Sequence, residues 1–176
     1  MDENSRLPKL QIVGYKNSGK TTVTTELVSR LTQQGWNVAT WKHHGHGGRP
    51  DMVTGTDSYL HQQAGSLAAG VEGGGEFHLS VKGLTQEGIL SFYEKLPIDL
   101  LIIEGYKQLA FPKIALLRTD QDKLLLDELE NVKAVICRDN SIEIATDIPV
   151  FLLDEKEKYL QWMESYLGRG RKHGKR

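Results

Sequence analysis

Gly14-Tyr-Lys-Asn-Ser-Gly-Lys-Thr21 matches the pattern G-x-x-x-x-G-K-[ST] at every defined position. Such a stretch binds phosphate when it joins a buried strand to a helix, because its glycines let consecutive N–H groups turn inward around the anion. The flanking residues meet that condition. Residues 10–14 are typical of a short buried strand, and residues 21–34 place apolar side chains on one helical face before Gly35 ends the helix. We therefore interpret this stretch as a phosphate-binding loop.

The loop and the start of the following helix supply the candidate nucleotide-binding residues. The helix N-terminus adds a positive dipole end to the backbone N–H groups. Lys20 would place its charge on the β- and γ-phosphates, which makes it a candidate catalytic residue, and the Thr21 hydroxyl would bind Mg²⁺. The full set is Gly14, Tyr15, Lys16, Asn17, Ser18, Gly19, Lys20, Thr21 and Thr22.

A carboxylate follows an apolar strand further along the chain. Asp99 opens a run of four apolar residues that ends at Glu104. A nucleotide site of this kind needs a carboxylate at the end of a neighbouring strand to hold Mg²⁺, so Glu104 is a candidate metal and catalytic residue. Asp99 should then lie at the opposite edge of the sheet. The alternative is that Glu104 is a solvated residue at a strand end.

The segment after the expected strand over residues 37–42 is rich in glycine and histidine. Residues 43–56 hold four glycines and three histidines, and their beginning should lie at the same sheet edge as the phosphate-binding loop. We interpret the segment as a switch that responds to nucleotide and substrate. Two alternatives stay open, a flexible surface loop and a transition-metal site built from the histidines. The candidate switch residues are Lys42, His43, Arg49 and Asp51, with Asp57 as a further Mg²⁺ ligand.

Strands and helices alternate along most of the chain. The strand, helix and strand over residues 10–42 form a βαβ unit, which requires parallel strands covered by helices. We therefore predict an α/β fold, a P-loop NTPase three-layer α/β/α arrangement with a mostly parallel central sheet. The other expected helices cover residues 57–69 (capped by Asp57), 84–96 and 154–167 (opened by Asp154-x-x-Glu157), and the other strands cover 76–81, 98–103, 113–117, 132–137 and 149–153.

Length and composition limit the class of protein. The 176 residues have a net charge of −1, with 39% hydrophobic and 26% charged residues, which fits one globular domain over residues 1–168 and a flexible tail over 169–176. The tail holds five Lys or Arg, so the body is acidic, which argues against nucleic-acid binding. Apolar runs fall far short of the ~20 residues of a membrane span. Residues 1–10 are polar and too short for a signal peptide, and the single cysteine excludes an internal disulfide. We expect a cytoplasmic protein.

The choice of base is not encoded in a recognisable motif. The Asn-Lys-x-Asp turn that often selects guanine is absent from the sequence. The nearest analogue is Cys137-Arg-Asp139, in which Asp139 could accept hydrogen bonds from a guanine edge. A simple turn before Ser141 is the alternative that we favour.

Four segments together resemble the molybdopterin-guanine dinucleotide biosynthesis protein B (MobB) family. They are residues 14–22, Lys42-His43, Asp57-Ser58-Tyr59 followed by Ala64-Gly65, and Leu101-Ile-Ile-Glu-Gly-Tyr-Lys107. The resemblance implies a homodimeric P-loop protein that uses GTP and Mg²⁺ and assists the guanylyltransferase that attaches GMP to molybdopterin. It also implies that Lys20 and Thr21 bind phosphate and Mg²⁺ and that Glu104 is the Walker-B-like carboxylate.

This sequence departs from that pattern inside the loop. Relatives such as the nitrogenase iron protein carry a second lysine directly after the first glycine, where this chain has Tyr15, and Lys16 comes one position late. We expect a slow GTPase that acts as an adapter, with residues 76–81 in the dimer contact. The alternatives are a carrier of nucleotide or cofactor without useful turnover, a small-molecule kinase, and a nickel metallochaperone GTPase.

Overall fold

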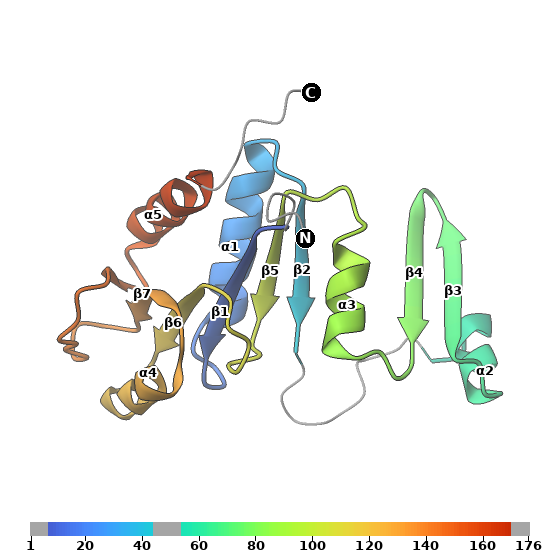
Figure 1. Ribbon diagram of the computed structural model, residues 1–176, viewed down its shortest axis with the longest axis horizontal. Helices are drawn as coiled ribbons and strands as arrows, with labels where there is room; N and C mark the ends of the chain where they lie inside the picture. The colour runs from blue at the N-terminus through green and yellow to red at the C-terminus, as the bar shows by residue number, and fades with distance from the viewer. Residues whose placement is uncertain (1–6, 44–53, 170–176) are drawn as a thin grey trace, which may run out of the picture. The chain divides into compact units, whose positions relative to one another are not determined.

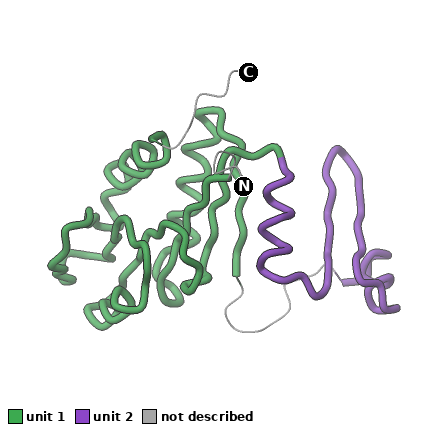
Figure 2. The backbone as a smooth tube through the Cα atoms, in the orientation of Figure 1, with its two compact units in different colours: residues 1–43, 97–176 green, residues 44–96 purple. Residues whose placement is uncertain are grey.

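The computed structural model describes residues 7–43 and 54–169, which divide into two compact units (Figure 2). The first unit is built from residues 7–43 and 97–169, and the second, from residues 54–96, interrupts it along the chain. Two compact units can share one folding domain, so the single domain expected over residues 1–168 stays a prediction. Of the basic tail expected over 169–176, only Arg169 is described.

A six-stranded parallel sheet forms the centre of the first unit (Figure 1). Its strands are β1 (Lys9–Gly14), β2 (Val38–Lys42), β5 (Leu100–Glu104), β6 (Lys113–Leu117), β7 (Val132–Cys137) and β8 (Val150–Leu152). Their order is β2-β5-β1-β6-β7-β8. Ile12 of β1 pairs with Glu104 of β5, and Lys42 of β2 pairs with Glu104 from the other side. The carboxyl ends of these three strands therefore lie together at one edge.

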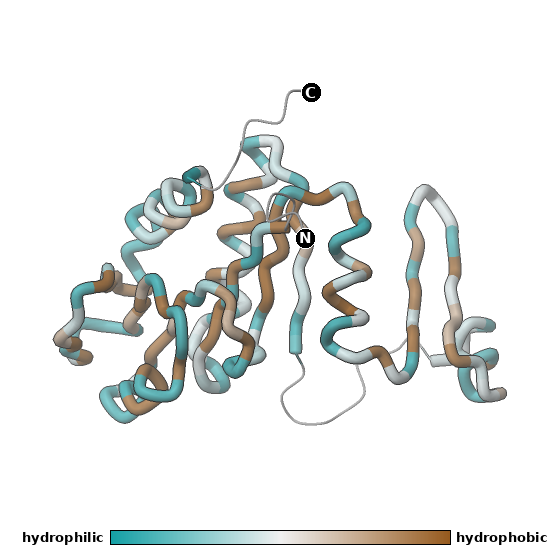
Figure 3. Tube along the Cα trace, in the orientation of Figure 1, coloured by the Kyte–Doolittle hydropathy of each residue, from teal (hydrophilic) through white to brown (hydrophobic). Residues whose placement is uncertain are grey.

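Helices cover both faces of this sheet. They are α1 (Lys20–Gln33), the 3-10 turn η1 (Asp120–Lys123), α4 (Leu124–Glu128) and α5 (Lys156–Gly168). Alternate strand residues belong to two apolar clusters: Ile12 packs in the cluster with α1 and α5, and Val13 packs in the cluster with α4. Strands β1 and β5 are apolar along most of their length because both of their faces are buried (Figure 3). The predicted three-layer fold is confirmed.

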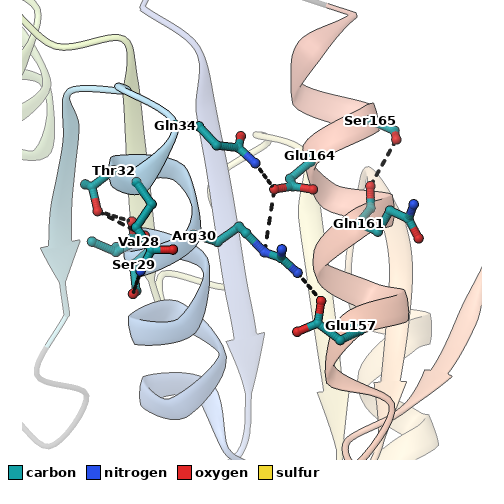
Figure 4. Close-up of polar contacts among 10 residues, drawn as sticks. Val28, Ser29, Arg30, Thr32, Gln34, Glu157, Gln161, Glu164 and Ser165 are labelled. Carbon is teal, nitrogen blue, oxygen red and sulfur yellow. Dashed lines mark hydrogen bonds and ion pairs between the residues drawn. The ribbon is translucent and has the colours of Figure 1, made fainter.

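Polar contacts between α1 and α5 complete the layer that carries the phosphate-binding loop (Figure 4). Arg30 of α1 donates to Glu157 and lies 3.6 Å from the Glu164 carboxylate, and Gln34 also donates to Glu164. Exposed ion pairs of this kind contribute little each. The apolar side chains buried between α1, α5 and the sheet therefore supply most of the stabilisation that holds α1 in place.

The second unit is a two-stranded antiparallel sheet with two short helices. Its elements are α2 (Asp57–Gln63), β3 (Ala68–Gly73), β4 (Glu76–Val81) and α3 (Gln86–Tyr93). The prediction of one helix over residues 57–69 is wrong, because α2 ends at Gln63 and residues 68–73 pair with β4. The predicted cap is also wrong: Thr56 accepts the Tyr59 N–H at 3.3 Å. Pairing with β4 is a tertiary contact, which overrides the local helical pattern.

Two further differences concern the end of the chain and the second face of the sheet. The capping signal Asp154-x-x-Glu157 does not act as predicted, because α5 begins at Lys156 and the Glu155 carboxylate accepts the Leu152 N–H at 3.0 Å. Glu157 instead pairs with Arg30. Two elements, η1 and α4, were not predicted from the sequence. No helix in the described ranges is long and apolar enough to cross a membrane.

Candidate functional site

The loop between β1 and α1 has the tight backbone turn that anion binding requires. Asn17 and Gly19 have positive φ angles of 60° and 94°, which reverse the chain direction over a few residues. At Gly14 a Cβ atom would lie 2.7 Å from the Leu116 carbonyl oxygen, so the neighbouring strand leaves no room for a side chain. Both glycines of the sequence motif are therefore required by the structure.

Unsatisfied hydrogen-bond donors surround this turn. The N–H groups of Lys20, Thr21 and Thr22 begin α1, and none has an acceptor among residues 7–43 and 54–169. The Ser18 hydroxyl is buried, with 6% of the residue exposed, and it too lacks a partner within those ranges. Free donors at a helix N-terminus form an anion-binding site, so a phosphate group would satisfy them.

The Lys20 ammonium lies within this turn. Its Nζ donates to the Tyr15 carbonyl oxygen at 2.7 Å, which folds the side chain back over the loop. Burial lowers the pKa of Lys20, and the charges of Lys42, Lys107 and Arg118 lower it further, whereas Glu104 opposes the shift. Lys20, Lys42 and Lys107 therefore outnumber the single carboxylate of Glu104 that acts on Lys20, and the excess positive charge suits a polyphosphate.

The Thr21 hydroxyl and the Glu104 carboxylate are in direct contact. Thr21 Oγ1 donates to Glu104 Oε1 and Oε2 at 3.0 and 3.2 Å. The Lys42 ammonium lies 3.2 Å from Glu104 Oε1 and 3.3 Å from Thr21 Oγ1, so a positive charge contacts both oxygens. Hard oxygen donors that hold a cation in this way fit Mg²⁺, which prefers carboxylate and hydroxyl ligands. The ammonium group stands in for such an ion.

Strand β5 places its two carboxylates at opposite ends, as predicted. Glu104 is the last residue of β5 and is only 8% exposed, and it lies beside the phosphate-binding loop. Asp99 precedes the first residue of β5, where its carboxylate accepts the Asn37 N–H at 2.8 Å. The solvated strand-end alternative for Glu104 is therefore wrong.

The turn after β5 is a structural part of the site that was not predicted from the sequence. Tyr106 has a φ angle of 53°, and its ring packs, tilted, against those of Trp41 and His43, with centroids 4.5 and 4.0 Å away. Gln11, which is fully buried in β1, donates to the Gly105 and Tyr106 carbonyl oxygens at 3.1 and 2.7 Å. A glutamine inside an otherwise apolar strand was the feature of the sequence that could have indicated this turn.

The ends of β6 and β7 carry structural turns at the same edge. Asp122, only 5% exposed, accepts hydrogen bonds from the Arg118 N–H at 2.8 Å and from the Thr119 hydroxyl at 3.2 Å. Burial opposes ionisation, but these hydrogen bonds prevail and hold the pKa of Asp122 below its ordinary value. Asp139 accepts the Ser141 N–H at 3.0 Å, which is the simple turn that the sequence favoured.

Several predicted residues stay untested. Lys16, Asn17 and Thr22 are exposed on the loop, as a contact with solvent or ligand requires. Asp57 belongs to the second unit, so its role as an Mg²⁺ ligand stays a prediction. Arg49 and Asp51 lie outside the described residues, as do most of the histidines of the switch segment. Within residues 7–43 and 54–169 there is no cluster of three His, Cys, Asp or Glu that could hold a metal.

The chain is similar to known proteins in both sequence and fold. A probable molybdopterin-guanine dinucleotide biosynthesis adapter protein of Bacillus subtilis (strain 168) is 31% identical over 150 residues, which cover 84% of this chain and 87% of the relative. The crystal structure of Bacillus subtilis MobB matches with a TM-score of 0.80 at 34% identity, covering 90% of this chain and 96% of that one.

A second crystal structure gives the same result. A MobB protein homolog from Bacillus stearothermophilus matches with a TM-score of 0.74 at 33% identity, covering 93% of this chain and 99% of that one. Residues 9–138, which include the phosphate-binding loop, Glu104 and the turn after it, match the family described as molybdopterin guanine dinucleotide synthesis protein B. The chain therefore belongs to the MobB family.

Proposed function

We propose that the protein is a GTP-binding adapter in the synthesis of molybdopterin guanine dinucleotide. The observation that carries this proposal is the contact of Thr21 with Glu104 beside the unsatisfied donors at the start of α1. Those donors suit a polyphosphate, and the hydroxyl–carboxylate pair suits the metal ion that accompanies it. Family membership supports the pathway, since relatives carry the adapter name.

The roles of the residues follow from their positions. The N–H groups of the loop and the Lys20 ammonium would hold the phosphates, and Thr21 and Glu104 would hold Mg²⁺, which neutralises phosphate charge when bound. Lys42 is 63% exposed at its side chain and pairs with Glu104 across 3.2 Å. A bound metal ion would repel this ammonium, so the ion pair of Lys42 with Glu104 should weaken when the metal binds.

We propose that GTP hydrolysis by this protein is slow. Hydrolysis needs a group that positions or deprotonates the attacking water. Among the described residues, Glu104 is the single carboxylate found in contact with the loop, and it is already occupied by Thr21 and Lys42. A carrier that binds nucleotide without useful turnover is therefore the close alternative. Single-turnover GTP hydrolysis, measured with and without the guanylyltransferase, separates the two.

Nucleotide binding itself is tested by calorimetry. We expect the protein to bind GDP and a non-hydrolysable GTP analogue more tightly with Mg²⁺ than with a chelator, and GDP more tightly than ADP. Equal affinity for guanine and adenine nucleotides would refute the proposed preference for guanine. Failure of every nucleotide to bind would refute the nucleotide site and leave only the adapter role that the family name supports.

We also propose a homodimer that uses the β3–β4 hairpin. Alternate residues of a strand share a face, so Phe77 and Leu79 of β4 lie on one side of the hairpin, and they are 62% and 45% exposed. A two-stranded sheet has little stability by itself, and exposed apolar residues favour a partner surface. The guanylyltransferase and molybdopterin are the other proposed partners, and the cytoplasmic location stays a prediction.

A further inference from the structure

We propose that Lys107 is a second phosphate-binding cation of the loop, which contacts the terminal phosphoryl group of a bound nucleoside triphosphate. The inference rests on the proposed function, because it assigns a further residue to the same nucleotide site. It starts from the position of the Lys107 ammonium, which lies 3.8 Å from the centroid of the Tyr15 ring.

Tyr15 links the two lysines. Its carbonyl oxygen accepts a hydrogen bond from the Lys20 ammonium, and its ring carries the Lys107 ammonium. Both ammonium groups therefore contact the same loop residue. Lysine at the position of Lys20 reaches the β- and γ-phosphates in loops of this kind, so Lys107 stands at the same end of the nucleotide.

Neither ammonium is neutralised. Within the described residues, no carboxylate lies at ion-pair distance from Lys20 or Lys107, whereas Lys42 is paired with Glu104. A carbonyl oxygen and an aromatic ring are weaker partners for an ammonium than a phosphate oxygen is. The arrangement therefore holds two like charges near each other with no carboxylate at ion-pair distance among the described residues, and a triphosphate would attract both.

Hydrogen bonds fix the backbone of the turn that carries Lys107. Gln11 is fully buried and donates to both carbonyl oxygens of the preceding turn, those of Gly105 and Tyr106. The Tyr106 carbonyl also accepts the Leu109 N–H at 3.1 Å, which fixes the chain on the far side of Lys107. A side chain whose backbone is anchored on both sides loses less entropy when it binds a ligand.

The position of the cation predicts a selective effect. Loss of the Lys107 charge should weaken the binding of a triphosphate more than that of a diphosphate, because the contact is made at the terminal phosphoryl group. A charge-assisted hydrogen bond to phosphate corresponds to about tenfold in affinity. The affinity for GDP should change by less than about twofold, since the other loop donors are intact.

The experiment measures GDP and β,γ-imido GTP by calorimetry with Mg²⁺, on the full chain. Lys107→Met keeps the length of the side chain and removes its charge, and Lys107→Arg restores the charge. Lys95→Met removes one exposed lysine from the second unit and serves as the charge control. Of these three variants, we expect Lys107→Met alone to lower the ratio of triphosphate to diphosphate affinity.

A double-mutant cycle tests the part played by the ring. Tyr15→Leu removes the surface on which Lys107 rests, so it should lower the same ratio, and it should add nothing in the Lys107→Met background. An unchanged ratio in Lys107→Met, with wild-type protein that binds both nucleotides, overturns the role of Lys107 and leaves the nucleotide site standing. Wild-type protein that binds neither nucleotide overturns the site, and this inference with it.

Discussion

Replacing Glu104 with glutamine should separate the metal-dependent part of nucleotide binding from the rest. Glutamine keeps the shape of the side chain and still offers an oxygen to the Thr21 hydroxyl, which lies 3.0 Å from Glu104 Oε1. The negative charge is lost. Binding that depends on Mg²⁺ should therefore fall, whereas binding to the loop donors and to Lys20 should stay.

The size of the effect follows from the geometry. A carboxylate that orients a metal ligand or its water shell changes metal affinity by about 10- to 100-fold when it is replaced. That range corresponds to about 1.4 to 2.8 kcal/mol. The free energy of unfolding should fall by much less than this. Glu104 pairs with Lys42 at 3.2 Å, but Lys42 is 63% exposed at its side chain, so solvent screening limits that ion pair to about 1 kcal/mol or less.

The assay is calorimetric titration of GDP in excess Mg²⁺ and in a chelator, with thermal unfolding measured in parallel. Asp99→Asn is the matched control, because Asp99 lies at the opposite end of the same strand and accepts a backbone N–H. The control should leave the effect of Mg²⁺ unchanged. An equal loss of affinity in Mg²⁺ and in chelator for Glu104→Gln would show that Glu104 only supports the loop.

Three other outcomes follow from single side chains. Lys20→Ala should weaken nucleotide binding by about 100-fold in calorimetry and leave the melting temperature nearly unchanged, since among the described residues Lys20 Nζ bonds only the Tyr15 carbonyl oxygen. Phe77→Ser, on a side chain that is 62% exposed, should shift sedimentation towards monomer at micromolar concentration, and Phe92→Ser on α3 should not. Hydrogen bonds hold the pKa of Asp122 below its ordinary value of 3.8, so the stability that its carboxylate contributes is present above that pH and is lost as the pH falls through the lower, folded value. Acid unfolding should therefore be less steep for Asp122→Asn, and identical acid profiles would refute this assignment.

Local sequence determined the phosphate-binding loop and the class of fold. The loop pattern is contiguous, and its two glycines meet steric demands that act over a few residues: the φ angle of 94° at Gly19 and the close approach of β6 to Gly14. The parallel sheet follows from the alternation of apolar strands with helices, because a helical crossover is the usual connection between parallel strands. Glu104 was predictable for the same reason, since a carboxylate after an apolar strand must emerge at its end.

Contacts between segments far apart in the chain were decided by the tertiary structure. The helix predicted over residues 57–69 ends at Gln63, and its last two residues belong to β3 because β4 pairs with them. The register of β2 against β5 placed the Lys42 ammonium on Glu104, and Gln11 of β1 anchored the turn that sets Lys107 on Tyr15. A sequence pattern records what each residue prefers locally. The identity of its neighbour across the sheet depends on strand order and register, which arise only when the whole core is packed.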